Sequence, residues 1–256
     1  QLALLWPELE PDNIAPHLML SFQPLDAGRS DDAVNHMADV INLGGELDFA
    51  AVPARTQRLS PDRRSRLIAN LRDLHQLYPE QRSIQYAVVE LLSQNQQLEE
   101  ALIELQILRQ NYGDSPRALL TESQLLFALE QPERARRVLR NGVRSFPEDK
   151  QLRFGFARLL IQEERYRDAH EQFEIIVEQD PTDYETIYSI ALLDMEMEDY
   201  DAAMERLALL IEADHRVDDC HFYLGYIHEQ LDQLEQAITH YRAVAIGSSN
   251  FAAAQQ

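Results

Sequence analysis

Alanine recurs along this chain at a fixed spacing of 34 residues. The alanine series runs Ala33, Ala101, Ala135, Ala169, Ala203 and Ala237, and Leu67 is its single exception. An apolar residue stands four places after each member, and a glycine, proline, histidine or serine stands twelve places after it. A chain with such an internal repeat stacks copies of one supersecondary unit, so this period constrains the fold more than any other feature.

The stretch RYRDAHEQFEIIVEQDPTD, residues 165–183, indicates what one unit contains. Ala169, Phe173 and Ile176 lie on one face of a helix, which Pro181 cannot continue. We expect alanine where two helices approach most closely, because a larger side chain would hold them apart. Glycine is scarce, at 8 of 256 residues, and Leu, Ala, Glu, Gln and Arg dominate, which favours an all-α fold.

The repeat length and the Ala-x3-Phe…Pro order resemble the tetratricopeptide repeat (TPR). The segment HFYLGYIH, residues 221–228, matches the first half of that signature through Leu224-Gly225, with His221 and His228 in its aromatic slots. The resemblance implies an all-α, right-handed superhelical solenoid of helix-turn-helix repeats. We expect five regular repeats over residues 82–251, at 82–115, 116–149, 150–183, 184–217 and 218–251.

The N-terminal part departs from this pattern. We interpret residues 14–81 as two irregular TPR-like helix pairs, because Pro24 and Gly28 interrupt the first unit and Pro53 makes the first helix of the second doubtful. Ser60-Pro61 predicts the start of a helix, with serine as N-cap. We expect residues 1–13 to end a preceding helical repeat and residues 252–256 to start a further one.

The resemblance also implies a concave groove lined by the first helix of each repeat, at its second, fifth, ninth and twelfth positions. An extended peptide or a partner helix suits such a groove, with aromatic and arginine side chains as anchors. The alternative is that the rings turn into the core of their own helix pair. The predicted partner-binding residues are Tyr86, Leu120, Phe127, Phe154, Arg158, Glu185, Tyr188, Met195, Asp219, Phe222, Tyr226 and Glu229.

A chaperone-tail receptor is not expected from these positions. Receptors of that kind hold a terminal carboxylate with Lys, Arg and Asn in the groove. Here the fifth positions of the five regular repeats are aromatic or leucine. This class of TPR function is therefore disfavoured.

The net charge of −21 is unevenly distributed. Residues 134–167 hold ten basic and four acidic side chains, whereas residues 168–240 hold two basic and twenty acidic ones. This argues against general binding to nucleic acid or to a membrane surface. Either the acidic part attracts a basic partner, or both segments are only solvated helix faces.

Reaction chemistry is not predicted. The sequence has no glycine-rich phosphate loop, no G-x-S-x-G motif and no CxxC pair, and its one cysteine, Cys220, does not identify a compartment. His221 and His228, with Asp232 beyond them, already have packing positions in the repeat, so we expect no metal and no cofactor. Asp194 takes the slot in its repeat that His228 takes in the next, so we considered an Asp–His pair between them.

Within the TPR family, the chain resembles bacterial outer-membrane TPR lipoproteins, in particular the adaptor of a carboxyl-terminal processing protease (the LbcA type). The resemblance rests on PEDKQLRFGFARLLIQEERYRDAHEQFEIIVEQDP and LDQLEQAITHYRAVAIGSSNF. It implies a non-enzymatic periplasmic scaffold that brings the protease together with cell-wall hydrolase substrates, with a lipid-bearing cysteine upstream. The alternatives are an envelope assembly factor, the non-catalytic arm of a larger enzyme such as a glycosyltransferase, and a cytoplasmic location.

Overall fold

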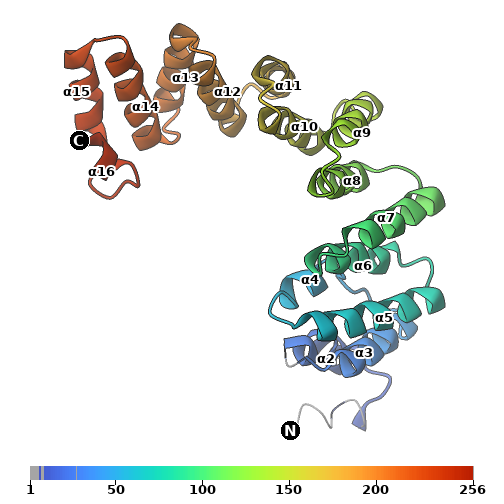
Figure 1. Cartoon of the computed structure of the whole chain (residues 1–256). Helices are drawn as coiled ribbons and strands as arrows, with labels where there is room; N and C mark the ends of the chain where they lie inside the picture. Colours follow the sequence, from blue (N-terminus) through green and yellow to red (C-terminus); the bar gives the residue numbers. More distant parts are fainter. Residues whose placement is uncertain (1–5, 7–8, 27, 256) are drawn as a thin grey trace. The chain divides into compact units, whose positions relative to one another are not determined.

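In the computed structural model, which describes residues 6, 9–26 and 28–255, the described chain is helical and contains no strand. Consecutive helices from α5 to α15 are joined by short turns (Figure 1). The helices are α2 (Ile14–Asp26), α3 (Ser30–Asn42), α4 (Ala51–Arg55), α5 (Pro61–Leu77), α6 (Arg82–Gln94), α7 (Leu98–Tyr112), α8 (Pro116–Ala128), α9 (Pro132–Ser145), α10 (Lys150–Gln162), α11 (Tyr166–Gln179), α12 (Tyr184–Glu196), α13 (Tyr200–Glu212), α14 (Val217–Gln230), α15 (Leu234–Ala243) and α16 (Phe251–Ala254). The predicted all-α class is confirmed.

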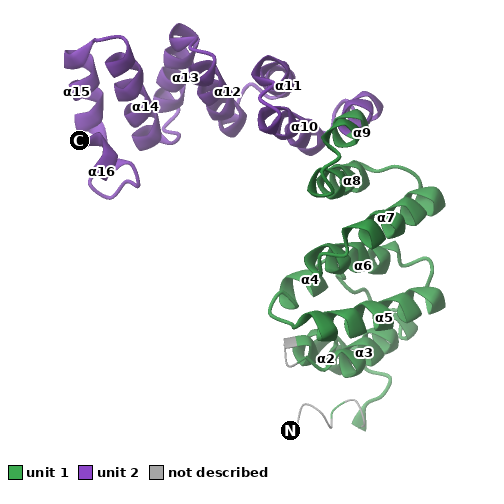
Figure 2. Ribbon diagram, in the orientation of Figure 1, with its two compact units in different colours: residues 1–138 green, residues 139–256 purple. Residues whose placement is uncertain are grey.

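The chain forms two compact units, residues 1–138 and 139–256, and the boundary falls inside α9 (Figure 2). In the first unit α2 packs on α3, α3 on α5, α5 on α6, α6 on α7 and α7 on α8. In the second unit each helix from α10 to α15 packs on the next. Packing against sequence neighbours is the arrangement expected of a repeat array, in which each copy buries the apolar faces of the copies beside it.

The alanine series lies in the packed interior. Its six alanines and Leu67 are between 0% and 3% exposed, and Met37, Leu71, Leu105, Leu139, Phe173 and Leu207, four places after them, are at most 1% exposed. All these residues belong to the second helix of a pair. The alanine series was predicted to lie where helices pack closely, and the burial of its side chains confirms this prediction.

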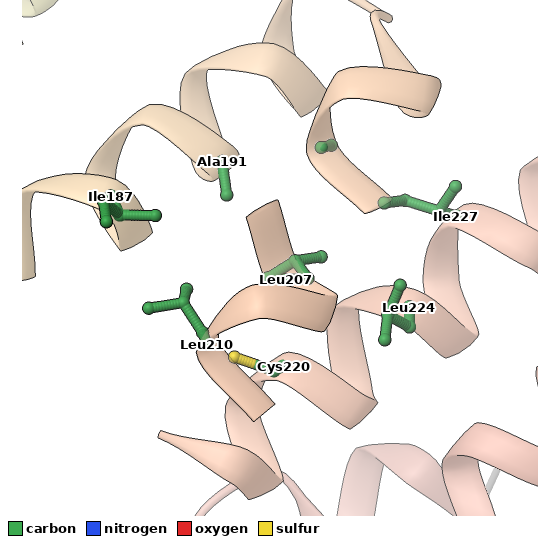
Figure 3. Packing of buried hydrophobic residues seen from close by; sticks show 8 residues of the cluster. Ile187, Ala191, Leu207, Leu210, Cys220, Leu224 and Ile227 are labelled. Atoms are coloured by element: carbon green, nitrogen blue, oxygen red, sulfur yellow. The ribbon is translucent and has the colours of Figure 1, made fainter. Parts of the chain in front are cut away.

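The core between α12, α13 and α14 illustrates how neighbouring pairs share one apolar cluster (Figure 3). Ile187 and Ala191 come from α12, Leu207 and Leu210 from α13, and Cys220, Leu224 and Ile227 from α14. Gly225 permits the next contact, because a Cβ there would lie 2.6 Å from the Tyr241 ring of α15. The Leu-Gly pair of the predicted signature therefore serves close helix packing.

The turn inside each of the five regular helix pairs holds one residue in the left-handed conformation. These residues are Gln96, Glu130, Glu164, Glu198 and Asp232, with φ between 57° and 60°, and they follow the same 34-residue period. None is a glycine, although glycine adopts this conformation at the lowest cost. Residue type alone therefore did not indicate this feature.

The irregular N-terminal part differs from its prediction in one respect. We expected Pro24 to interrupt the first unit, but α2 runs through it to Asp26. Proline removes one backbone donor and crowds the carbonyl four residues before it, and α2 continues for only two residues beyond Pro24. Gly28 lies in the following turn with φ +71°.

The second irregular unit has a first helix of only 5 residues, α4, which contains Pro53. Its second helix, α5, begins at Pro61 after an extended Ser60 (φ −63°, ψ 156°), so the predicted start is confirmed, although the Ser60 side chain makes no capping hydrogen bond. The predicted helix end over residues 1–13 lies partly outside the described residues, and so does Gln256 of the predicted further repeat. No helix in the described part has the length and apolar character required to cross a bilayer.

Candidate protein-binding surface

A hollow of about 440 Å³ lies between α6 and α8, the first helices of two consecutive repeats. Tyr86 and Glu90 line it from α6, and Arg117 and Gln124 line it from α8. These four side chains stand at the fifth, ninth and second positions that the family resemblance assigned to the groove. The hollow is a polar and aromatic surface on the face where a partner is expected.

Tyr86 is held at both ends in this hollow. Its hydroxyl lies 2.9 Å from the Ser115 hydroxyl, and the Arg117 guanidinium lies 4.6 Å from the centre of its ring. Arg117 Nη2 is 3.9 Å from Glu90 Oε2, and both of these side chains are about half exposed. An exposed ion pair at this distance contributes little, so Arg117 is free to exchange Glu90 for a group on a partner.

Tyr188 carries a similar arginine in the second unit. The Arg216 guanidinium lies 4.8 Å from the ring centre of Tyr188, and Arg216 itself adopts the left-handed conformation (φ 48°) before α14. Burial raises the pKa of the Tyr188 hydroxyl, so it stays protonated at neutral pH. Tyr188 and Met195 both pack against the α12–α14 core, which leaves each of them half-buried.

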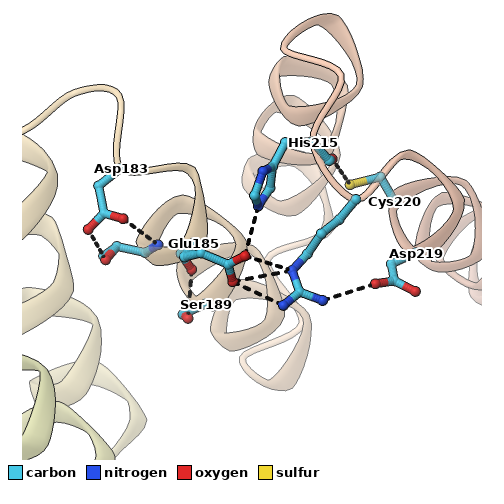
Figure 4. A network of polar contacts seen from close by, with 8 residues as sticks. Asp183, Glu185, Ser189, His215, Asp219 and Cys220 are labelled. Atoms are coloured by element: carbon cyan, nitrogen blue, oxygen red, sulfur yellow. Dashed lines mark hydrogen bonds and ion pairs between the residues drawn. The ribbon is translucent and has the colours of Figure 1, made fainter.

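Arg216 forms ion pairs with two carboxylates, those of Glu185 and Asp219, which Figure 4 labels. Its Nη2 and Nε lie 3.1 and 3.2 Å from Glu185 Oε2, and its Nη1 lies 3.3 Å from Asp219 Oδ2. The hydrogen bond from Arg216 lowers the pKa of Glu185, which is therefore ionised at neutral pH. The structure thus brings three predicted residues, Glu185, Tyr188 and Asp219, together around one arginine.

Two predicted anchor rings lean onto the second helix of their own pair. The Phe154 ring centre is 5.0 Å from that of Phe173 in α11, and the Phe222 ring centre is 5.9 Å from that of Tyr241 in α15. Glu229 accepts a hydrogen bond of 2.7 Å from the Tyr241 hydroxyl. Phe154 and Phe222 are half-buried, which is nearer to the alternative considered for these rings, a role in the helix-pair core.

The most open predicted aromatic residues are Phe127 at 38% exposure and Tyr226 at 41%. Arg158 and Glu229 are exposed, and Leu120 is half-buried. Phe127 and Leu120 lie on α8 in the first unit, and Tyr226 lies on α14 in the second. The assignment of these positions to a binding groove stays a prediction.

Arg117 and Arg216 were missed by the sequence analysis. Arg117 stands at the second position of its repeat, so the groove rule could have found it. Arg216 follows no such rule, because it lies in the turn between two repeats and reaches Tyr188 through a left-handed backbone. Only its placement in space reveals its role.

The considered Asp194–His228 pair does not form. Asp194 instead lies 2.6 Å from Arg206 Nη1 and 3.0 Å from His170 Nε2. Burial raises the pKa of Asp194, and Arg206 and His170 oppose that rise. Repeat symmetry placed Asp194 correctly in its slot, but its partners come from the neighbouring helices α11 and α13.

His228 contacts other residues of the last helix pair. Its ring stacks on His240 with ring centres 5.3 Å apart, and its Nδ1 is 2.6 Å from Gln233 Oε1. His221 Nδ1 also lies 3.0 Å from His240 Nδ1. Both histidines therefore take part in packing between α14 and α15, the role expected of them.

The tetratricopeptide repeat family matches residues 126–193 and 160–221 of this chain. The TPR repeat-containing protein PA4667 of Pseudomonas aeruginosa is 31% identical over 157 residues. This alignment covers 60% of the chain and 26% of the Pseudomonas protein, so the chain spans about a quarter of that relative.

Two solved structures share the fold. A tetratricopeptide repeat protein from Parabacteroides merdae has a TM-score of 0.52 and 15% identity, and the match covers 93% of this chain and 95% of that protein. The MamA fragment 41-end from Desulfovibrio magneticus RS-1 has a TM-score of 0.54 and 20% identity over 64% of this chain and 92% of the fragment. Residues 126–221 thus match the tetratricopeptide repeat family, and the helix pairs on either side of them share the fold of solved tetratricopeptide repeat proteins.

Proposed function

We propose that this chain is a protein-binding scaffold that brings a periplasmic protease of the carboxyl-terminal processing type together with cell-wall hydrolase substrates. The match of residues 126–221 to the TPR family supports the general role of a scaffold, since stacked helix pairs present extended surfaces to partners. The finer role is supported by the resemblance of residues 147–181 and 231–251 to bacterial lipoprotein adaptors of such proteases. A non-enzymatic role and a lipid anchor upstream of the chain are parts of the same proposal.

The observation that carries the scaffold proposal is a pair of tyrosine–arginine stacks, in which both tyrosines lie on first helices of repeats. Tyr86 with Arg117 and Tyr188 with Arg216 each combine a large ring with a planar cation, and these are residue types enriched at binding hot spots. Carboxylates lie beside both arginines. Such a surface can bind a peptide that offers backbone carbonyls, carboxylates or apolar side chains.

A co-precipitation experiment tests the proposal. The chain is immobilised, and envelope proteins of the bacterium that encodes it are passed over it and identified by mass spectrometry. We expect a carboxyl-terminal processing protease and at least one cell-wall hydrolase among the bound proteins. Capture of polysaccharide-export or lipopolysaccharide proteins, without the protease, would favour an envelope assembly factor instead.

Two variants locate the surface. Tyr226→Ala and Arg117→Ala remove exposed side chains from first helices, and each is expected to weaken partner binding by about tenfold, the effect of losing a contact worth about 1.4 kcal/mol. Ile238→Ala is the matched control, because Ile238 is 49% exposed on the second helix α15. Equal binding by all three variants would remove the first-helix surface from the proposal.

The distribution of charge gives an independent test. If the acidic residues between 168 and 240 attract a basic partner, affinity falls between ionic strengths of about 0.1 M and about 1 M, where the Debye length shrinks from about 10 Å to about 3 Å. An affinity that does not change with salt would instead assign the binding energy to the aromatic side chains.

A further inference from the structure

A cluster of metal-ligand side chains lies between α2 and α3, far in sequence from the surface described above. His17 comes from α2, and His36 and Asp39 come from α3. One ligand atom of each residue lies within 4.8 Å of the other two. His36 and Asp39 are three residues apart, so a single helical face presents both of them to His17.

The three ligand atoms form a small triangle. His17 Nδ1 lies 3.1 Å from His36 Nδ1 and 3.0 Å from Asp39 Oδ2, and His36 Nδ1 lies 3.8 Å from the same carboxylate oxygen. Zn²⁺ binds nitrogen and oxygen at about 2.0–2.2 Å, so tetrahedral coordination places neighbouring ligand atoms about 3.3–3.6 Å apart. The observed sides bracket that separation, and small side-chain rotations would equalise them.

The surroundings resemble a half-open coordination site. The His17 side chain is 8% exposed, whereas those of His36 and Asp39 are 22% and 47% exposed. The buried histidine is fixed by packing, and the two other ligands border solvent, through which an ion can enter. We propose that His17, His36 and Asp39 bind a divalent transition-metal ion such as Zn²⁺, with the fourth position facing water.

Imidazole and carboxylate donors suit this class of ion. Coordination through His17 Nδ1 leaves the ring proton on Nε2, a buried atom without a hydrogen-bond partner among the described residues. Metal-bound histidines usually donate this second N–H to an acceptor, and the absence of such an acceptor lowers the affinity for the metal. We therefore expect an affinity below that of a structural zinc site with four protein ligands.

The repeat supplies its own control. His221 and His240 stand 204 residues after His17 and His36, a spacing of six repeats, and their Nδ1 atoms are 3.0 Å apart. The position that corresponds to Asp39 is Ala243 there. The last helix pair thus has the two histidines without the carboxylate.

The test uses the full chain, freed of metal with a chelator and then titrated with ZnCl2 in a calorimeter. We expect one Zn²⁺ per chain and a rise in Tm with zinc, because an ion that binds only the folded state stabilises it. Asp39→Asn and His36→Gln should each weaken binding by about tenfold or more, and His240→Gln should leave it unchanged. Circular dichroism of the zinc-free variants checks that their helix content is that of the original chain.

Cobalt gives a second readout. Co²⁺ at this site should produce visible absorption bands that Asp39→Asn abolishes and His240→Gln preserves. A cluster that is only a hydrogen-bonded pair of histidines would give no metal-dependent heat and no bands, which would overturn the proposal. Loss of binding in His240→Gln, or equal affinity in Asp39→Asn and the original chain, would overturn it as well.

Discussion

The irregular repeat at residues 48–81 and the regular repeat at residues 150–183 have the same length and differ in the contacts that hold their helices together. In the second, α10 and α11 have 13 and 14 residues and pack directly on each other. In the first, α4 has 5 residues, and the 17-residue α5 packs on α3 and α6, which belong to the units on either side. An irregular repeat is therefore tolerated where its neighbours cover the apolar face that its own first helix leaves open.

Both repeats have a buried arginine that binds a loop carbonyl, and the arginine of the irregular repeat binds more carbonyls. Arg64 and Arg153 are each 7% exposed. Arg64 donates to the carbonyls of Gln57 and Leu59, in the loop before α5, and to the carbonyl of Gln94 at the end of α6. Arg153 donates to the Pro147 carbonyl and the Gln172 side chain.

In the irregular unit, one cation thus binds loop carbonyls that have no place in a regular helix. Buried carbonyls need such partners, because leaving them without a hydrogen bond is costly. We call these Arg64 hydrogen bonds the polar tie; they connect the loop before α5 to the end of α6, where the first helix of the repeat is short.

Leu67→Ala is expected to have the largest effect. Leu67 takes the alanine position of the irregular unit and is fully buried, so the substitution opens a cavity and lowers the free energy of unfolding by about 2–5 kcal/mol. Urea unfolding measures the loss, and hydrogen exchange shows whether it is concentrated in α3, α5 and α6. An effect below about 1 kcal/mol would mean that this unit needs nothing larger than alanine there.

Arg64→Met should rank second. It keeps an unbranched chain but removes the hydrogen bonds to the three carbonyls, at a cost of about 1.5–3 kcal/mol, the range for bonds to a charged group. Arg66→Met, at an exposed site on the same helix, is the control and should change stability by less than about 0.5 kcal/mol. Equal stability of the two variants would refute the polar tie.

Ala169→Leu is the converse of Leu67→Ala in the regular unit. The side chain of Ala169 is fully buried between packed helices, so the added volume should destabilise the chain by about 1–3 kcal/mol through overpacking. Glu171→Leu, at an exposed position on α11, controls for the added leucine. If Ala169→Leu stabilised the chain, the alanine series would reflect something other than close packing.

Glu164→Gly should have the smallest effect and the opposite sign. Glu164 has φ 57°, where glycine is unstrained, so we expect a gain in stability of less than about 1 kcal/mol. Gln162→Gly, in the last turn of α10, is the control and should cost about 1 kcal/mol. Thermal unfolding of both variants, side by side, would expose a common sign, which would contradict a strained turn.

Much of the fold could be predicted from the spacing of residues, because equivalent positions in successive repeats make equivalent contacts. The alanine series, its apolar partners four residues on and the start of α5 at Ser60-Pro61 all follow from side-chain size and backbone restriction, which are local properties. The extent of α2 was misjudged, since proline disfavours a helix without always ending it at once.

The candidate surface was less predictable. Spacing identified Tyr86 and Tyr188 as first-helix residues, but Arg117 and Arg216 reach them from the following repeat or from the turn before it. Spacing also left open whether Phe154 and Phe222 face solvent or their own helix pair. The orientation of each ring depends on contacts with the second helix of its pair, and the position of the residue within the repeat does not specify those contacts.

By itself, the sequence determined the period, the all-helical class and the residues that face the packed interior, because each depends on how a short segment satisfies its own backbone and apolar side chains. The tertiary structure alone decided which polar groups meet: Arg216 with Glu185, Arg64 with the Gln94 carbonyl, and His17 with His36 and Asp39. Those contacts join residues that are not neighbours along the chain, and a hydrogen bond or ion pair forms only where packing brings its two partners within about 3 Å of each other.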